Sequence, residues 1–191
     1  MTLEELHIET ERLIIRPYRE ADGLSLKNGI DESLVSLKEF MPWARYEPEA
    51  VIHKERRIER WNQDILNDKD FTLGIFSKTN QAFIGSTGLH RRSENGIYEI
   101  GYWVHQEFQG KGYITEAAEA LTNFAFEHLD AEKLEIRCGE KNIKSAQIPQ
   151  RLNYTLEYTF RTLEKNQEGK RLKHQVWCLF KEEWKNDYTH S

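Results

Sequence analysis

The chain has 191 residues, of which 31% are charged and 38% hydrophobic, and its formal net charge is -5. This length suits one domain with a sizeable core, and no apolar run approaches the roughly 20 residues that cross a bilayer. The acidic balance argues against general nucleic-acid binding, and the absence of a signal-like start favours a cytoplasmic location. Cys138 and Cys178 match no zinc spacing, so we expect two buried thiols and no metal site.

The first third of the chain predicts one strand followed by helices. Residues 13–15 are apolar and are closed by a proline, which indicates a strand. Residues 20–30 have helical character, and Asp31 is placed to cap a second, short helix that ends near Pro42. A longer polar helix follows, and its apolar stripe consists of Ile58, Trp61 and Ile65.

From residue 70 the hydrophobic period becomes that of strands. The segments FTLGIFS, AFIGSTGLH and IYEIGYWV are consecutive and predict an antiparallel meander. A helix is predicted over residues 112–128, then strand LEIRCG, short helix NIKSAQIPQRL, and strands YTLEYTFRTL and HQVWCLF. This order predicts an α+β fold, a mixed sheet covered by helices, in a single domain spanning residues 1–191.

The segment EFQGKGYITEA lies where a predicted strand feeds into a helix. The first N–H groups of such a helix lack partners and lie at its positive end. Gly110 and Gly112 leave room for an anion, Lys111 adds a charge and Thr115 a hydroxyl, so the segment predicts a pyrophosphate site. The alternative is that the glycines only permit a tight turn. The spacing fits neither a P-loop nor the dinucleotide fingerprint.

The run EIGYWVHQEFQGKGYITEA resembles motif A of the GNAT acetyltransferases, in particular the branch of RimJ/RimL-type ribosomal-protein N-acetyltransferases. The opening TERLIIRPYREAD, the segment MPW at 41–43, and Asn142-x-x-Ser145 followed by RLNYTLEYTFR extend the resemblance over about residues 8–184. It implies the GNAT fold, with a mostly antiparallel seven-stranded sheet splayed between its fourth and fifth strands. It also implies transfer of the acetyl group of acetyl-CoA to an amine.

The resemblance implies roles for particular residues. The pantetheine arm of acetyl-CoA is expected between the splayed strands, near the backbone of Trp103 and Val104, and Asn142 is expected to contact the same arm. Ser145 matches the position of an acid that protonates the departing thiolate. The amides expected to hold the pyrophosphate are those of Gln109, Gly110, Lys111, Gly112, Tyr113 and Ile114.

Attack on a thioester needs a neutral amine, so a nearby base is expected. Glu164 matches a base position of the ribosomal-protein branch, and Glu99 lies on the strand of the acetyl site. A surface role for Glu164 and a structural ion pair for Glu99 are the alternatives. His90 could face the acceptor, with a structural role as the alternative. Cys138 could form a covalent acetyl-enzyme, against the one-step rule of the family.

Three positions depart from the family pattern. Glu107 precedes the glycines where glutamine or arginine is usual, and we expect it to point to solvent. Asn153 replaces a glycine and can keep the left-handed conformation. Pro149 removes a helical N–H donor from the Ser145 carbonyl.

The acceptor is left open by the sequence. The resemblance favours a protein N-terminus, such as that of a ribosomal protein, and a small amine (polyamine, amino acid or aminoglycoside) is an alternative. A module that binds coenzyme A without turnover is a second alternative. A structural homodimer is a third, with Trp177 and Phe180 as candidate interface residues or, alternatively, core residues.

Overall fold

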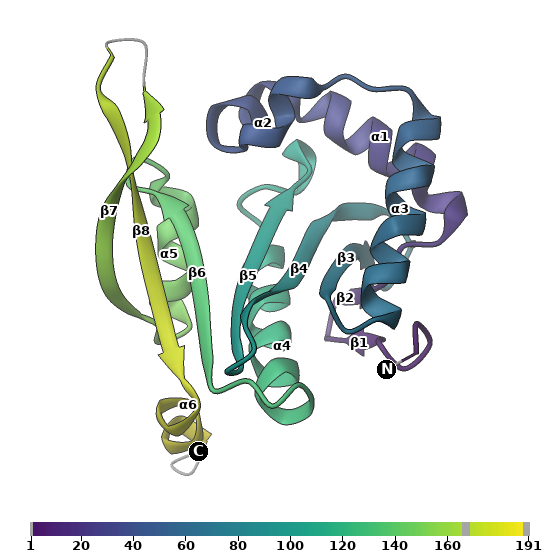
Figure 1. Ribbon diagram of the computed structural model, residues 1–191. Coiled ribbons are helices and arrows are strands. Elements are labelled where there is room, and N and C mark those ends of the chain that lie inside the picture. The colour runs from purple at the N-terminus through teal and green to yellow at the C-terminus, as the bar shows by residue number, and fades with distance from the viewer. Residues whose placement is uncertain (1, 166–168, 189–191) are drawn as a thin grey trace.

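The computed structural model describes residues 2–165 and 169–188. One eight-stranded sheet runs through the molecule in the order β1-β2-β3-β4-β5-β6-β8-β7 (Figure 1). Its strands are β1 (Ile8–Glu9), β2 (Leu13–Arg16), β3 (Asp70–Ser77), β4 (Phe83–Ser93), β5 (Ile97–Val104), β6 (Lys133–Gly139), β7 (Thr155–Lys165) and β8 (Arg171–Phe180). The sheet has one strand more than the sequence predicts, because the two-residue β1 pairs with β2.

Helices cover both faces of the sheet. They are α1 (Gly23–Glu32), α2 (Leu34–Phe40), α3 (Val51–Leu66), α4 (Tyr113–His128), α5 (Ile143–Arg151) and α6 (Lys181–Tyr188), with short 3-10 helices η1 (Glu20–Asp22), η2 (Pro42–Tyr46) and η3 (Gln106–Phe108). The helices α1 and α3 lie on one face, and α4 lies on the other (Figure 1). No helix among the described residues is long and apolar enough to cross a membrane.

Alternation along the strands builds a core on each face of the sheet. Phe71 and Leu73 of β3 point toward α4 and join its buried Leu121 in the larger cluster. The smaller cluster, between the sheet and α1 and α3, includes Leu26 and Ile58. Two clusters on opposite faces fix the sheet as the middle layer of one domain.

One detail differs from the sequence-based expectations, and one of the alternatives for Trp177 is confirmed. Asp31 does not cap a second helix, because α1 runs on to Glu32 and Ser33 occupies the position before α2. Trp177 is 7% exposed and packs in the larger core cluster, so it is a core residue and is not available to a dimer interface.

The sheet splits between β5 and β6, its only parallel neighbours among the described strands. They pair at three positions, the last of which is Glu99 with Glu135, and then separate (Figure 1). Past that point β5 stays paired with β4 as far as Val104, and β6 stays paired with β8 as far as Gly139. The strands therefore follow different neighbours, and one edge of β5 is left without a strand partner.

Candidate active site

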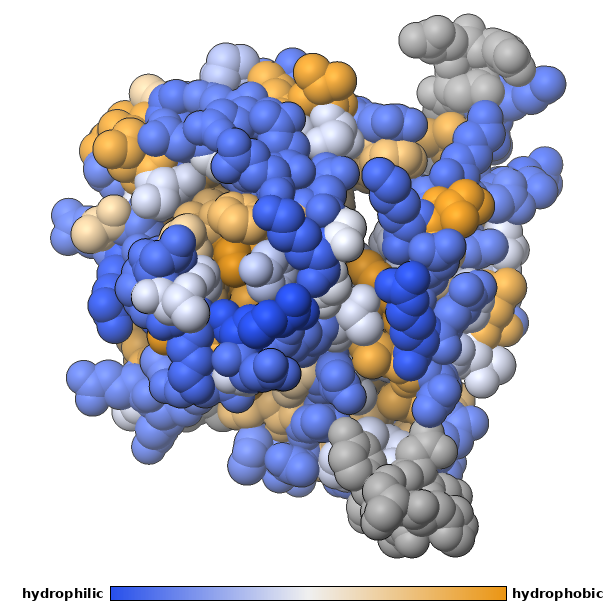
Figure 2. All heavy atoms as spheres, turned by 180° about the vertical axis from the view of Figure 1, so that it is seen from behind, coloured by the Kyte–Doolittle hydropathy of each residue, from blue (hydrophilic) through white to orange (hydrophobic). Residues whose placement is uncertain are grey.

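A cavity of about 700 Å³ opens on the α1 and α3 face of the sheet and reaches the β5–β6 split. Its apolar wall includes Met41, Trp43 and Trp103, whose two indole rings lie 6.3 Å apart. The space-filling view from behind shows the molecule hollowed between the β7–β8 hairpin and the rest of the chain (Figure 2). A cavity of this size suits a small-molecule or peptide-end ligand.

The anion cradle predicted at EFQGKGYITEA has the backbone geometry that this role needs. Gly110 and Gly112 have φ values of +72° and +80°, the left-handed region that favours glycine. A side-chain carbon at Gly110 would meet nothing within 4 Å. In the described chain, the backbone N–H groups of residues 110–115 donate no hydrogen bond to protein, and Glu116 is the first with a helical acceptor, at 3.1 Å. Six consecutive free donors at a helix start fit a pyrophosphate.

Arg12 holds this cradle from the other end of the chain, a contact that the sequence did not reveal. Its Nη1 donates to the Lys111 carbonyl at 3.0 Å, and its Nε donates to the Glu116 carboxylate at 2.7 Å. Because C=O and N–H point in opposite directions across a trans peptide, the Gly112 N–H is turned away from Arg12. Arg12 thus orients at least one amide of the cradle. Glu107, which precedes the cradle in the chain, is exposed to solvent, as predicted.

Trp103 and Val104 lie at the end of β5, in the stretch whose outer edge has no strand partner. The Trp103 ring packs against Phe83 at a centroid distance of 5.7 Å, which fixes the strand end over the smaller core. The open backbone edge faces the split. An extended ligand can hydrogen-bond such an edge as an added strand would.

Asn142 and Ser145 lie across the split from β5, at the start of α5. The Asn142 side-chain oxygen accepts from the Ser145 N–H at 3.2 Å and so caps the helix that carries Ser145. The side-chain nitrogen of Asn142 stays available, because no described residue accepts from it. Asn153, at the far end of this segment, has the predicted left-handed conformation, with a φ of +60°.

Tyr102 completes the surroundings of Ser145 and was not singled out for this role by the sequence. The Ser145 hydroxyl donates to the Tyr102 oxygen at 3.2 Å, and Tyr102 donates to the Ser145 carbonyl at the same distance. Burial raises the pKa of Tyr102 well above its usual range, so the phenol stays protonated. Burial also raises the pKa of Cys138, which leaves a neutral thiol and disfavours a nucleophilic role.

The two carboxylates predicted as bases lie in different places. Glu99 lines the cavity, and its Oε2 accepts from Arg92 at 2.9 Å and forms an ion pair with the Nε of Arg137 at 3.1 Å. Glu164 lies on β7, does not line the cavity, and is 3.9 Å from the exposed Arg45. The structure therefore brings Glu99 to the cavity as a doubly paired ion and leaves Glu164 outside the lining.

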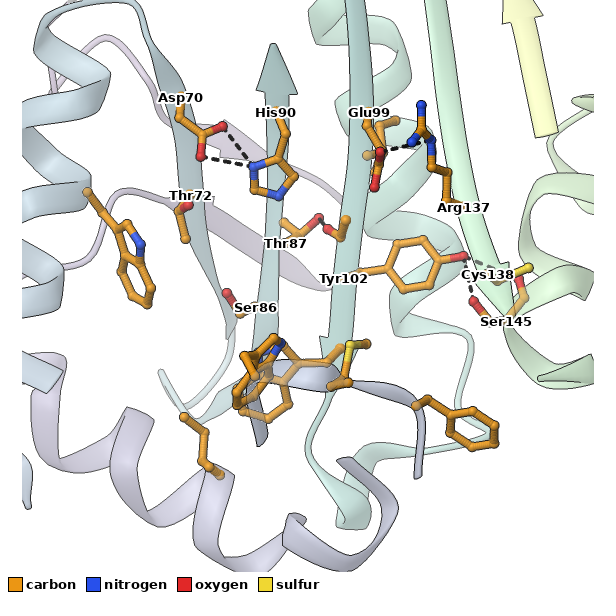
Figure 3. A pocket seen from close by; sticks show the side chains of 18 of the residues that line it. Asp70, Thr72, Ser86, Thr87, His90, Glu99, Tyr102, Arg137, Cys138 and Ser145 are labelled. Atoms are coloured by element: carbon orange, nitrogen blue, oxygen red, sulfur yellow. Dashed lines mark hydrogen bonds and ion pairs between the residues drawn. The ribbon is translucent and has the colours of Figure 1, made fainter. Parts of the chain in front are cut away.

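His90 has a partner that the sequence analysis missed. Its Nδ1 lies 2.7 and 3.0 Å from the two carboxylate oxygens of Asp70 on β3 (Figure 3). Both residues line the cavity, and their side chains are 28% and 35% exposed. The signal that could have found the pair is strand pairing, since Asp70 and His90 stand opposite each other.

Comparison with known proteins matches this geometry to a family. The chain matches the acetyltransferase (GNAT) domain family over residues 12–155. It belongs to this family, and it is an acetyl-CoA-dependent N-acetyltransferase, as the motif resemblance predicts.

Two of the relatives carry the names of ribosomal acetyltransferases, and others are named only as N-acetyltransferases. The chain is 28% identical over 148 residues (77% of this chain, 80% of the relative) to YdaF of Bacillus subtilis, named "Putative ribosomal N-acetyltransferase". It is 24% identical to the N-acetyltransferase YnaD of the same organism, over 94% of this chain and 99% of the relative.

Solved structures agree on the fold. A crystal structure named as an acetyltransferase matches with a TM-score of 0.85 and 26% identity, covering 94% of this chain and 99% of that chain. The ribosomal L7/L12 α-N-protein acetyltransferase RimL, in complex with coenzyme A, matches with a TM-score of 0.83 over 91% of this chain and 97% of that chain. RimL is 19% identical to this chain, so the match shows that the two proteins share a fold and no more.

Proposed function

We propose that this acetyltransferase acts on the N-terminal α-amine of a protein, such as a ribosomal protein, and that the amine attacks the thioester directly. The proposal rests on three features: six free amides at residues 110–115, the open edge of β5, and a cavity of about 700 Å³ that reaches the split. A cosubstrate spanning the split would present its acetyl end to that cavity. The names of the relatives support a protein acceptor.

The residues of the cradle and the split would hold acetyl-CoA. The amides of Gly110, Lys111, Gly112, Tyr113 and Ile114, with the Thr115 hydroxyl, would bind the pyrophosphate. The Gln109 amide, which the resemblance also implies, already donates to the Gln106 carbonyl at 3.4 Å. The backbone of Trp103 and Val104 and the side-chain nitrogen of Asn142 would meet the pantetheine arm. Ser145 would donate its proton to the departing thiolate, and its bond to Tyr102 keeps that hydroxyl beside the split.

The proton on the acceptor amine needs a base, for which Glu99 and Glu164 remain candidates. Glu99 would have to accept a proton while two guanidinium groups hold its Oε2. Glu164 would have to act from outside the cavity lining. Only Oε1 of Glu99 has no partner among the described residues, so this oxygen is the one through which Glu99 would act.

The charges of the cavity favour one amine over a polyamine. Lys54 is fully buried and pairs with both Glu47 and Glu49, and Arg57 pairs with Glu49 at 2.8 Å. These carboxylates are therefore neutralised and leave no row of free negative charges for several ammonium groups.

The cytoplasm, where ribosomes assemble, is the location proposed for the reaction.

Titration calorimetry and a peptide assay test the proposal together. Wild-type protein is titrated with acetyl-CoA beside the double variant Gly110→Glu/Gly112→Glu, in which two carboxylates would fill the cradle. We expect saturable binding by the wild type that the variant loses. Synthetic peptides with a free N-terminal serine or alanine, and spermidine, are then offered as acceptors, with thiol release as the readout. Binding without acetylation of any acceptor would favour the non-catalytic module, and acetylation of spermidine alone would favour a small-amine enzyme.

A further inference from the structure

The Asp70–His90 pair has a defined tautomer. An ionised carboxylate only accepts hydrogen bonds, so the Nδ1 of His90, at 2.7 Å from Asp70, must be the N–H donor. A neutral imidazole protonated at Nδ1 carries its lone pair on Nε2. No described residue hydrogen-bonds Nε2. The pair therefore presents one unoccupied basic nitrogen to the cavity.

Two glycines allow the imidazole ring to lie close to the sheet. A side-chain carbon at Gly88 would lie 3.1 Å from the ring, and one at Gly101 would lie 3.0 Å from Nε2 itself. Such distances are too short for ordinary packing, so any other residue at either position would push the ring away. Nε2 thus lies directly over Gly101 on β5.

Gly101 is the second residue past the last pairing of β5 with β6. Nε2 therefore lies over β5 just where its other edge opens to the split. The hydroxyls of Tyr102 and Ser145 lie on the opposite side of β5 (Figure 3). A proton acceptor and a proton donor thus flank the segment where the acetyl end of the cosubstrate is proposed to lie.

The charges around the ring leave it as the free base of the cavity. Glu99 stands opposite His90 in the β4–β5 pairing, but its Oε2 is held by Arg92 and Arg137. The charged side chains that share the cavity with His90 are Glu47, Glu49, Arg57, Lys69, Asp70, Arg91, Arg92, Glu99 and Arg137. Glu47 and Glu49 are paired with Lys54 and Arg57.

We propose that His90 is the general base of the reaction and that Asp70 is its positioning residue. This inference rests on the proposed attack of an amine on the thioester. Nε2 takes one proton from the acceptor's ammonium group, which leaves a neutral amine and an imidazolium ion facing the Asp70 carboxylate. The amine nitrogen then bonds to the acetyl carbon, and the electron pair of the breaking carbon–sulfur bond goes to sulfur.

The remaining protons balance through Ser145 and solvent. Ser145 gives a proton to sulfur and regains the one that the nitrogen loses as the amide forms. His90 returns its proton to water before the next turnover. The products are an N-acetyl group, a thiol and one released proton.

The first test needs no acceptor. Two-bond nitrogen–proton NMR spectra of protein labelled with 15N-histidine report which ring nitrogen carries the proton, and His90→Gln assigns the signals. In the neutral ring we expect the proton on Nδ1 and not on Nε2, with and without acetyl-CoA, and loss of this preference in Asp70→Asn. A proton fixed on Nε2 would overturn the proposal.

The second test is the pH profile of kcat/KM with a peptide that carries a free N-terminal serine. General-base catalysis raises a rate by about 10²–10⁴-fold, so kcat/KM of His90→Gln is expected to fall by at least about 100-fold at neutral pH. Its residual rate should rise with pH until the α-amine itself is neutral, near about 7.7–8.0. Asp70→Asn should lower kcat/KM about tenfold and shift the acidic limb of its pH profile. The KM for acetyl-CoA should change little in either variant.

Three matched variants separate the outcomes. His53→Gln removes an exposed histidine on α3 and is expected to match the wild type. Glu99→Gln and Glu164→Gln test the carboxylate bases. One of these two variants could show the large loss of kcat/KM and the altered acidic limb while His90→Gln stays close to the wild type. That result would assign the base to the carboxylate concerned and overturn the proposal. If the wild type acetylates no peptide, the acceptor proposal fails, and the tautomer alone decides the role of the pair.

Discussion

The Tyr102 hydroxyl donates to the carbonyl of Ser145 at 3.2 Å, and this carbonyl is the one that Pro149 leaves without a helical donor. In a regular helix the N–H of residue 149 would bond the carbonyl of residue 145, and proline has none. A strand residue therefore replaces a missing helical bond. The same hydroxyl accepts from Ser145 Oγ. Tyr102 therefore links α5 to β5 across the split at the point where Pro149 interrupts the helical hydrogen bonds.

Tyr102→Phe is expected to lower the free energy of unfolding by about 1–3 kcal/mol, because it leaves a part-buried carbonyl without a donor. In a Pro149→Ala background, where residue 149 regains an N–H, the same substitution should cost measurably less. Urea unfolding of the four proteins in this double-mutant cycle measures the difference. Equal costs in both backgrounds would show that Tyr102 does not substitute for the helical donor.

Gly110→Ala and Gly112→Ala test whether the cradle depends on left-handed backbone. Each should lose about 1–2 kcal/mol of stability, since an alanine resists positive φ. Each should also weaken coenzyme A binding by about tenfold, because relaxing φ turns the amides away from the anion. The matched control is Gly169→Ala, which has a φ of +76° and open surroundings but lies in the β7–β8 hairpin. It should lose similar stability and no affinity, and a loss of affinity there would argue against a local effect.

Arg12→Lys should weaken coenzyme A binding by about five- to tenfold, or about 1–1.4 kcal/mol. A lysine cannot reach the Lys111 carbonyl and the Glu116 carboxylate at once, so the 111–112 peptide is released. Calorimetry well below the unfolding temperature of the variant measures this effect apart from any loss of stability. An unchanged dissociation constant would mean that Arg12 serves only the packing of the N-terminal segment.

Glu116 makes stability depend on pH in the acidic range. Burial alone would raise its pKa, but hydrogen bonds from Thr10 and Arg12 hold that pKa below its ordinary value of 4.5. A carboxyl with a lowered folded pKa contributes stability that is present above about 4.5 and is lost as pH falls through the folded value. Unfolding of the wild type and Glu116→Gln should therefore differ at neutral pH and converge in acid. A difference that does not shrink would contradict this linkage.

The sequence determined what depends on residues close together in the chain. The shift from helical to strand-like period located the meander, and the glycine spacing located the cradle, because period and backbone conformation are local properties. Asn153 was read correctly for the same reason. The motifs also placed the chain in its family.

Which side chains meet at the site depends on the register of the packed sheet. Phe76 pairs with Phe83 but Ile75 pairs with Gly85, so Ile84 is an extra residue in β4. Counting back from the turn without this bulge would pair Asp70 with residue 89 and put His90 on the other face of the sheet.

Contacts between distant segments escaped the sequence for a related reason. Arg12 reaches Lys111 across 99 positions, and Tyr102 reaches Ser145 across 43. Nothing local in either segment specifies its partner, because these contacts depend on strand order and helix packing. The sequence thus determined the left-handed backbone of the cradle. The packed sheet decided that the Asp70–His90 and Tyr102–Ser145 pairs lie on either side of β5 (Figure 3).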